Sequence, residues 1–201
     1  MDKAVNPATA RAKSLARCAM AMAIMTVAAW VTIPFGPVPY TLQPIGILFA
    51  LFALRPKEAL ASIAGYLLLG ALGLPVFTSF RGGLAALMGP TGGFLVGYLV
   101  GGALALAVAY AVRQLPVFSR QRKRAFLGVQ IASGRLAVNL LMGVVFLAVI
   151  YLFGWAWLMM VGNLSPEAAF MASVAPFVVV DAIKMLVAVA LGQAVGSALR
   201  G

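Results

Sequence analysis

The chain has 201 residues, of which 64% are hydrophobic and only 9% are charged. Soluble domains average about 25% charged residues, so this composition indicates an all-α integral membrane protein with little room for a separate soluble domain. The chain has no histidine and one cysteine, Cys18, which leaves no side-chain set for zinc, haem or an iron–sulfur cluster. We therefore expect no metal site, no cofactor and no disulfide.

The formal net charge of +11 could indicate a nucleic-acid partner. The basic residues, however, lie in short tracts beside apolar segments, which is the pattern of membrane topology determinants. We therefore expect the chain to lie in a lipid bilayer and to bind no nucleic acid.

The N-terminal tail, residues 1–14, precedes a first apolar segment at residues 15–33. The tail is similar to the start of a signal peptide, but the apolar segment is long and has no clean cleavage site. We interpret it as a retained membrane span that follows a short cytoplasmic tail.

Two short apolar segments, 45–54 and 59–74, follow a proline-rich loop at 34–44. Prolines fix φ and lack an N–H donor, so this loop is expected to be rigid and non-helical. A span needs about 20 residues to cross a bilayer, and both segments are shorter. Either the loops 34–44 and 75–93 dip to membrane depth and line a cavity, or the bilayer thins around shorter helices. We favour the cavity.

The second loop, 75–93, contains five glycines and a single charged residue, Arg81. Glycines permit close approach of the backbone to a ligand. No Gly-Lys-Ser/Thr follows them, so the loop is not a Walker phosphate-binding motif. Glycines alone would be explained by a turn and close helix packing, but together with Arg81 they favour a ligand-binding loop.

A fourth span at 94–112 is followed by a basic linker at 113–135. Within the linker we expect an interfacial helix at 125–132, followed by a fifth span at 136–157. Arg135 then lies at the membrane boundary, where a long side chain reaches water. If the fifth span begins at Leu127 instead, Arg135 lies within the membrane and could face Asp181.

A turn at 162–167 separates the fifth span from the last, which lies within 172–199. Ser165 is expected to cap a helix whose first residue is Pro166.

The last span contains Asp181 and Lys184, which share one face of a helix because they lie three residues apart. Each charge at membrane depth costs about 2.5–3.5 kcal/mol, so such residues usually face a partner or a wet cavity. One interpretation is a ligand site near mid-depth. The other is a self-neutralising pair that only holds helices together.

The chain has no nucleotide-binding motif and no Ser–His or Cys–His nucleophile pair, so we expect no catalytic residues and no enzyme activity. An outward cup with aromatic, hydroxyl, amide and charged groups suits a small ligand that has an apolar body, an anionic group and a neutral hydrogen-bonding head. The alternative is an ion-coupled secondary carrier for a small organic anion, with Asp181 as proton site and Lys184 as counter-charge. We find no similarity between the first and last three spans that would support inverted repeats. Besides Arg81, Asp181 and Lys184, the expected lining consists of Phe35, Tyr40, Thr41, Gln43, Phe77, Thr78, Ser79, Phe80 and Thr91.

A combination of motifs runs through the chain from the first span to the last. The motifs are residues 33–43, 69–77 and 89–94, Gly82-Gly83, and Pro176-Phe177 followed by Asp181 and Lys184. This combination resembles the BioY family, the biotin-specific substrate-binding (S) components of energy-coupling-factor (ECF) transporters. The resemblance implies a single six-helix membrane domain, residues 1–201, with the ECF S-component fold. It also implies biotin bound at the extracytoplasmic side, and association with a transmembrane coupling protein (T component) and two ABC-type ATPases.

The resemblance also assigns residues. It puts Asp181 and Lys184 in the biotin site, and it places the coupling protein against Ala19 and Ala23 of the first span. These alanines form a small-x-x-x-small pair, which lets another helix approach closely, although from spacing alone they could equally pack inside the chain's own bundle. The basic linker, 113–135, matches no pattern that defines its role. Weaker candidates for the biotin site are Tyr40, Thr41, Gln43, Arg81 and Gly83.

Both termini are predicted to be cytoplasmic, because six spans put twelve of the fifteen basic residues on the side of the termini and Arg81 alone on the other. When the protein is in the cell membrane, a C-terminal reporter that works in the cytoplasm should therefore be active. Activity of a reporter that works only outside the cytoplasm would contradict the six-span topology.

Overall fold

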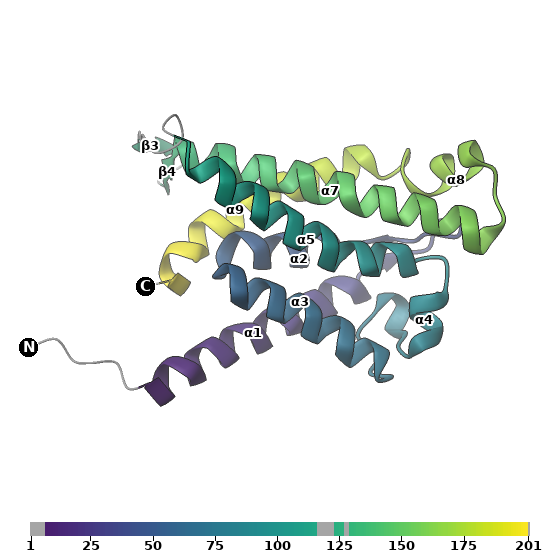
Figure 1. Ribbon diagram of the computed structural model, residues 1–201, viewed down its shortest axis with the longest axis horizontal. Helices are drawn as coiled ribbons and strands as arrows, with labels where there is room; N and C mark the ends of the chain where they lie inside the picture. The colour runs from purple at the N-terminus through teal and green to yellow at the C-terminus, as the bar shows by residue number, and fades with distance from the viewer. Residues whose placement is uncertain (1–6, 116–122, 127–128, 201) are drawn as a thin grey trace, which may run out of the picture.

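The computed structural model describes residues 7–115, 123–126 and 129–200 of the chain. The described part is mainly α-helical and forms an elongated bundle (Figure 1). Its helices are α1 (Pro7–Trp30), α2 (Gln43–Ala53), α3 (Pro56–Ala71), α4 (Leu84–Met88), α5 (Gly92–Arg113), α7 (Ser133–Gly162), α8 (Pro166–Ser173) and α9 (Val178–Arg200), with a 3-10 turn η1 (Thr78–Phe80).

Four of these helices, α1, α5, α7 and α9, are long and apolar enough to cross a membrane. Helix α2 is apolar but has only 11 residues, and α3 has 16. Both fall short of the roughly 20 residues that a span needs, as the sequence predicted. These features confirm the prediction of a helical membrane protein. The described residues form four helices that are long enough to span a membrane, and the shorter α2 and α3 lie between the first and second loops.

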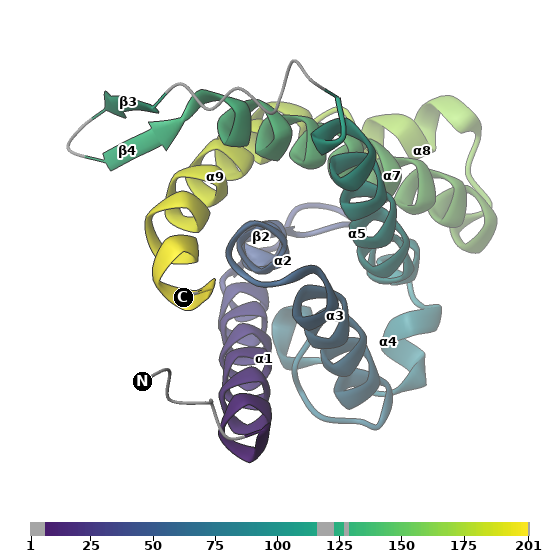
Figure 2. The same cartoon turned by 60° about the vertical axis from the view of Figure 1, so that its left-hand side comes forward.

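Helix α2 is the centre of the bundle. Figure 2 shows it end-on, enclosed by α1, α3, α5 and α9, and nine of its eleven residues are buried. A helix that is apolar on every side is stable only when other helices cover it. Its position explains why a segment too short to cross a membrane alone is still helical.

Glycines allow the helices to approach closely. A Cβ at Gly46 of α2 would lie 3.0 Å from the Cα of Met25 in α1, and one at Gly97 of α5 would lie 3.1 Å from the Cα of Ile150 in α7. Small residues at such contacts are typical of helix packing in lipid, where association depends on close van der Waals contact.

The first loop is non-helical, as its prolines predicted. It contains a small antiparallel pair, β1 (Thr32–Ile33) with β2 (Tyr40–Thr41), in which Thr32 faces Thr41. The pair brings the chain straight back from the end of α1 to the start of α2. The proline segment between the two strands contributes to the cavity described below.

The interfacial helix predicted at 125–132 is wrong. The chain instead forms an antiparallel hairpin, β3 (Lys123–Phe126) with β4 (Val129–Ala132). Val129 and Ile131 are β-branched and alternate with Gln130, which is the period of a strand, and Gly128 weakens a continuous helix. Arg135 lies exposed in the first turn of α7, in agreement with the boundary interpretation.

The last apolar segment begins in α8 and continues in α9, and the single span predicted within 172–199 is confirmed as Val178–Gly196 of α9. Helix α8 begins as predicted, with Pro166 at its first position and the Ser165 Oγ accepting a bond from the Ala168 N–H at 3.3 Å. Pro176 cannot continue a helix, and α9 begins at Val178. Asp181 therefore lies in the first turn of α9.

Candidate functional site

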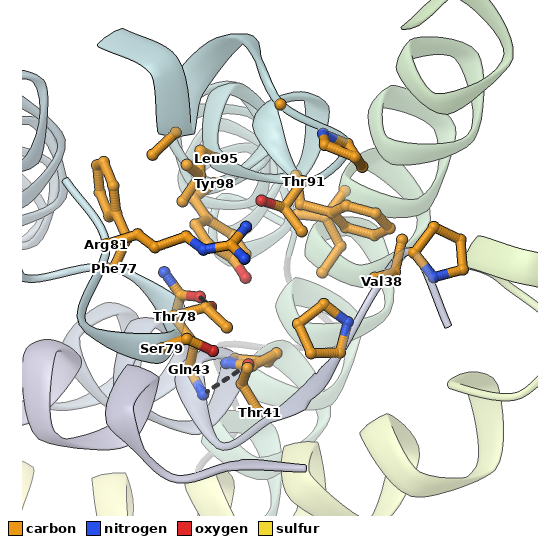
Figure 3. Close-up of a pocket in the computed structure, with 18 of the residues that line it drawn as sticks. Val38, Thr41, Gln43, Phe77, Thr78, Ser79, Arg81, Thr91, Leu95 and Tyr98 are labelled. Carbon is orange, nitrogen blue, oxygen red and sulfur yellow. Dashed lines mark hydrogen bonds between the residues drawn. The ribbon is translucent and has the colours of Figure 1, made fainter. Parts of the chain in front are cut away.

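A cavity of about 520 Å³ lies between the first loop, the second loop, the first turns of α5 and α9, and the middle of α7 (Figure 3). Its walls combine proline and aromatic surface with a smaller number of polar groups, which is typical of a site for a small organic molecule. The polar side chains that line it are Thr41, Gln43, Thr78, Ser79, Arg81, Thr91, Tyr98, Asp181 and Lys184.

The two charges of α9 form an ion pair at the cavity wall. Lys184 Nζ donates to Asp181 Oδ1 at 2.7 Å, and Tyr151 Oη of α7 donates to Asp181 Oδ2 at 2.9 Å. The Asp181 and Lys184 side chains are only 4% and 8% exposed. Each carboxylate oxygen thus has a donor, as a buried charge requires.

Lys184 has hydrogen-bonding capacity to spare. An ammonium group has three N–H donors, and among the described residues the only acceptor recorded for Lys184 is Asp181. Because the side chain lines the cavity, its remaining donors are available to a ligand. Asp181 likewise keeps lone pairs, since a carboxylate accepts about four hydrogen bonds.

Gln43 connects the two loops beneath the cavity. Its Nε2 donates to Tyr66 Oη at 2.7 Å, and Tyr66 in turn donates to the Val76 carbonyl at 2.9 Å. Thr78 Oγ1 donates to the Gln43 Oε1 at 3.4 Å, and the Gln43 backbone N–H donates to Thr41 Oγ1 at 3.3 Å. Gln43 is almost fully buried, so this network fixes the relative position of both loops.

Arg81 is the cation that the second loop contributes. Its backbone closes a tight turn, with the Phe77 N–H donating to the Arg81 carbonyl at 2.9 Å. Figure 3 shows the side chain extending from this loop into the cavity. The turn depends on Gly82, where an added Cβ would overlap the carbonyl of Leu74.

Two of the predicted site residues, Tyr40 and Gly83, do not line the cavity. Tyr40 Oη donates to the Pro176 carbonyl at 2.8 Å, and its ring packs on Phe177 with centroids 4.4 Å apart. Gly83 has a φ of +84°, a conformation that favours glycine, and its N–H donates to the Gly70 carbonyl at 2.6 Å. Both residues therefore support the walls.

Phe77 is the one predicted aromatic that reaches the cavity; Phe35 and Phe80 are exposed outside it. Sequence reasoning missed the apolar and tyrosine lining contributed by α5, α7 and α9, because those segments read as plain membrane spans. The hydroxyl groups of Tyr98 and Tyr151 were the available signal, since a buried tyrosine in an apolar helix usually bonds a polar partner. The missed lining residues include Phe94, Leu95, Tyr98, Ile150 and Phe177.

Ala19 and Ala23 lie on the outer surface of α1. Both are exposed, whereas the residues of α1 that enter the core are Ala21, Met25 and Ala29. The alternative interpretation, that these two alanines pack inside the chain's own bundle, is therefore wrong.

Three comparisons relate the chain to known proteins. The family model described as "BioY family" matches residues 1–201. The probable biotin transporter BioY of Pyrococcus horikoshii is 33% identical over 183 residues, which cover 91% of this chain and 96% of that protein. The biotin transporter BioY of Rhizobium etli is 37% identical over 165 residues, covering 82% and 81%.

A solved structure has the same fold. It is the crystal structure of the S-component for biotin from an ECF-type ABC transporter, and it matches with a TM-score of 0.75 and 28% identity. The match covers 95% of this chain and 94% of that one. The likeness therefore extends over nearly the whole of both chains.

Proposed function

This chain belongs to the BioY family, and on that premise we propose that it is the biotin-binding S component of an ECF transporter and that it serves biotin uptake. The observation that carries the proposal is the Asp181–Lys184 pair at the wall of a 520 Å³ cavity, in a bundle that matches a solved biotin S-component. The volume is within the range of about 300–1,000 Å³ that is usual for small-ligand sites.

The chemistry of biotin fits the groups that line the cavity. Biotin has a ureido head with two N–H donors and a carbonyl acceptor, an apolar sulfur ring and a carboxylate tail. We assign the ureido N–H groups to Asp181 and the carbonyl or the carboxylate to Lys184, since these two residues offer the matching acceptor and donor. Arg81, Thr41 and Gln43 are further binding residues, while Phe77 and Phe177 contact the apolar ring.

Six helices are proposed to span the membrane, with α2 and α3 as the short spans and the two loops filling the space that they leave. Figure 1 supports this arrangement, since the described ends of α1 and α9 and the β3–β4 hairpin lie at one end and α4 and α8 at the other. The basic residues cluster at the first end, which is the cytoplasmic side by the positive-inside rule. The cavity then opens on the extracytoplasmic side of the cell membrane.

The proposed partners are a transmembrane coupling protein and two ABC-type ATPases, which supply the energy for uptake. The sequence itself has no nucleotide-binding motif, in keeping with this division of labour. Ala19 and Ala23 are proposed as the docking point, because their exposed small side chains allow a partner helix to approach closely.

The purified protein should bind biotin, and the proposal is tested by equilibrium binding with thiamine and riboflavin as comparators. Saturable binding of biotin with no measurable binding of the other two vitamins is expected. Equal binding of all three, or binding of none, would contradict a biotin site.

Removing either charge of the pair should weaken biotin binding. For Asp181→Asn and Lys184→Met we expect a loss of about 1.5–3 kcal/mol, the contribution of a charge-assisted hydrogen bond, or roughly a 10- to 150-fold higher Kd. Tyr151→Phe should weaken binding less, because it leaves the pair intact but removes one donor to Asp181. Glu167→Gln is the control and should bind biotin normally, because it changes an exposed acid of α8 that does not line the cavity.

Two other results would change the interpretation of the pair. Normal binding with a lowered Tm would show that the pair only holds helices together. Normal binding with uptake that depends on a proton gradient through Asp181 would favour the ion-coupled carrier.

Bulky residues on the docking face should separate binding from transport. Ala19→Trp and Ala23→Trp should leave biotin binding by the isolated protein intact, because the cavity lies at the opposite end of the bundle. They should abolish co-purification with the coupling protein and ATP-dependent uptake. Ala103→Trp, on the exposed face of α5, is the matched control. Loss of fold together with biotin binding would refute the docking role.

A further inference from the structure

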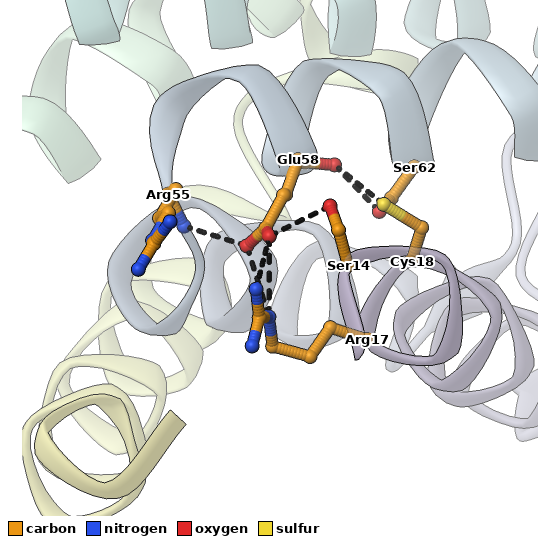
Figure 4. Close-up of polar contacts among 6 residues, drawn as sticks. All are labelled: Ser14, Arg17, Cys18, Arg55, Glu58 and Ser62. Carbon is orange, nitrogen blue, oxygen red and sulfur yellow. Dashed lines mark hydrogen bonds and ion pairs between the residues drawn. The ribbon is translucent and has the colours of Figure 1, made fainter. Parts of the chain in front are cut away.

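The first half of α1 is held to the bundle by polar contacts (Figure 4). The buried residues of α1, Ala21, Met25 and Ala29, all lie in its second half. At the far end, Trp30 Nε1 donates to the Pro75 carbonyl at 2.8 Å, so that end is fixed to the second loop. The contacts recorded for the first half instead converge on one residue of α3, Glu58.

Glu58 receives hydrogen bonds from two turns of α1. Ser14 Oγ donates to its Oε1 at 2.8 Å, and the Arg17 guanidinium donates through Nη2 at 2.5 Å and through Nε at 3.2 Å. Cys18 Sγ is 3.6 Å from the Glu58 carbonyl oxygen. The Glu58 side chain is 7% exposed and the Arg17 side chain 17%, so this ion pair is partly shielded from water.

Glu58 is itself held in place by α3. Its Oε2 accepts the backbone N–H of Arg55 at 3.3 Å, and its carbonyl accepts the Ser62 hydroxyl at 2.7 Å. The carboxylate is therefore a fixed point on α3, and the position of α1 is set relative to it.

These contacts lie on the side of α1 opposite to its docking face. At 3.6 residues per turn, Ser14 and Arg17 point away from a row of small residues on the other side of the helix. Every residue of that row is exposed. The row consists of Ala12, Ala16, Ala19 and Ala23.

We propose that Ser14, Arg17 and Glu58 form a clamp that fixes the position and rotation of α1 so that its alanine row is presented to the coupling protein. This inference rests on the proposed function, because it concerns how the docking face is held. Without the clamp, the first half of α1 samples other positions, and only the fraction of molecules in the docking position binds the partner. The three residues are positioning residues, since they touch neither biotin nor, by their orientation, the partner.

The test uses the full-length protein, with Arg17→Met and Glu58→Gln as separate variants. Arg17→Met removes the tie between the helices but leaves the carboxylate that accepts the Arg55 N–H. Both variants should bind biotin with the wild-type Kd. Their affinity for the coupling protein should fall about ten-fold, as expected if a tenth of the molecules hold the docking position.

Two further variants make the result specific. Lys57→Met removes an exposed cation next to Glu58 and should dock normally. Arg17→Glu combined with Glu58→Arg reverses the pair and should restore docking relative to either single change. Effects of the single changes that do not come from the broken ion pair would not be repaired by this reversal.

Ala19→Trp, measured in the same docking assay, separates failure of the clamp from failure of the proposed function. If Ala19→Trp abolishes docking and the clamp variants dock like wild type, the clamp is refuted and the docking face stands. If Ala19→Trp docks normally, the docking face falls and the clamp falls with it. Loss of biotin binding in the clamp variants would also refute the clamp, because it would show a general role in the fold.

Discussion

The ion pair between Asp181 and Lys184 is the interaction on which the site depends. A charge buried without a partner costs several kcal/mol, so neither residue could stay in the bundle alone. The helical spacing supplies the mutual partner, and Tyr151 supplies the second donor to the carboxylate. Two charges are thus held at the cavity wall, where part of their hydrogen-bonding capacity is left over.

The cavity itself results from the shortness of two helices. Helix α2 has 11 residues and lies at the centre of the bundle, so it cannot fill the full height of the longer helices around it. The two loops cover the remaining space. Backbone that is not helical can lie at membrane depth only where protein or a wet cavity surrounds it, and here the Gln43 network satisfies part of that demand.

Helix α1 connects the two ends of the molecule. Trp30 contacts the second loop, where its ring centroid lies 4.8 Å from that of Phe80. Arg17 contacts Glu58 of α3 about one turn before Ala21, the first buried residue of α1. The cavity lies at one end of the bundle, and the contacts of Ser14 and Arg17 with Glu58 lie in the first half of α1. The alanines proposed for docking line no part of the cavity.

The sequence by itself determined the class of protein, the non-helical first loop, the two short helices and the pairing of Asp181 with Lys184. These follow from local rules: apolar length, proline geometry and the three-residue spacing on a helix. It also brought together Thr41, Gln43 and Arg81, which line the cavity, through the composition of the loops. It failed at 125–132, where weak local preferences for helix and strand compete, and it left open where α9 begins, which the break at Pro176 sets.

Only the tertiary structure decided which side chains meet across the bundle. Tyr151 reaches Asp181 from 30 residues away, and Ser14 and Arg17 reach Glu58 from more than 40. The structure also moved Tyr40 and Gly83 from the cavity to its supporting walls and turned Ala19 and Ala23 outward. Such contacts depend on the rotation and spacing of packed helices, which no local pattern specifies, because every face of an apolar helix offers a similar surface to its neighbours.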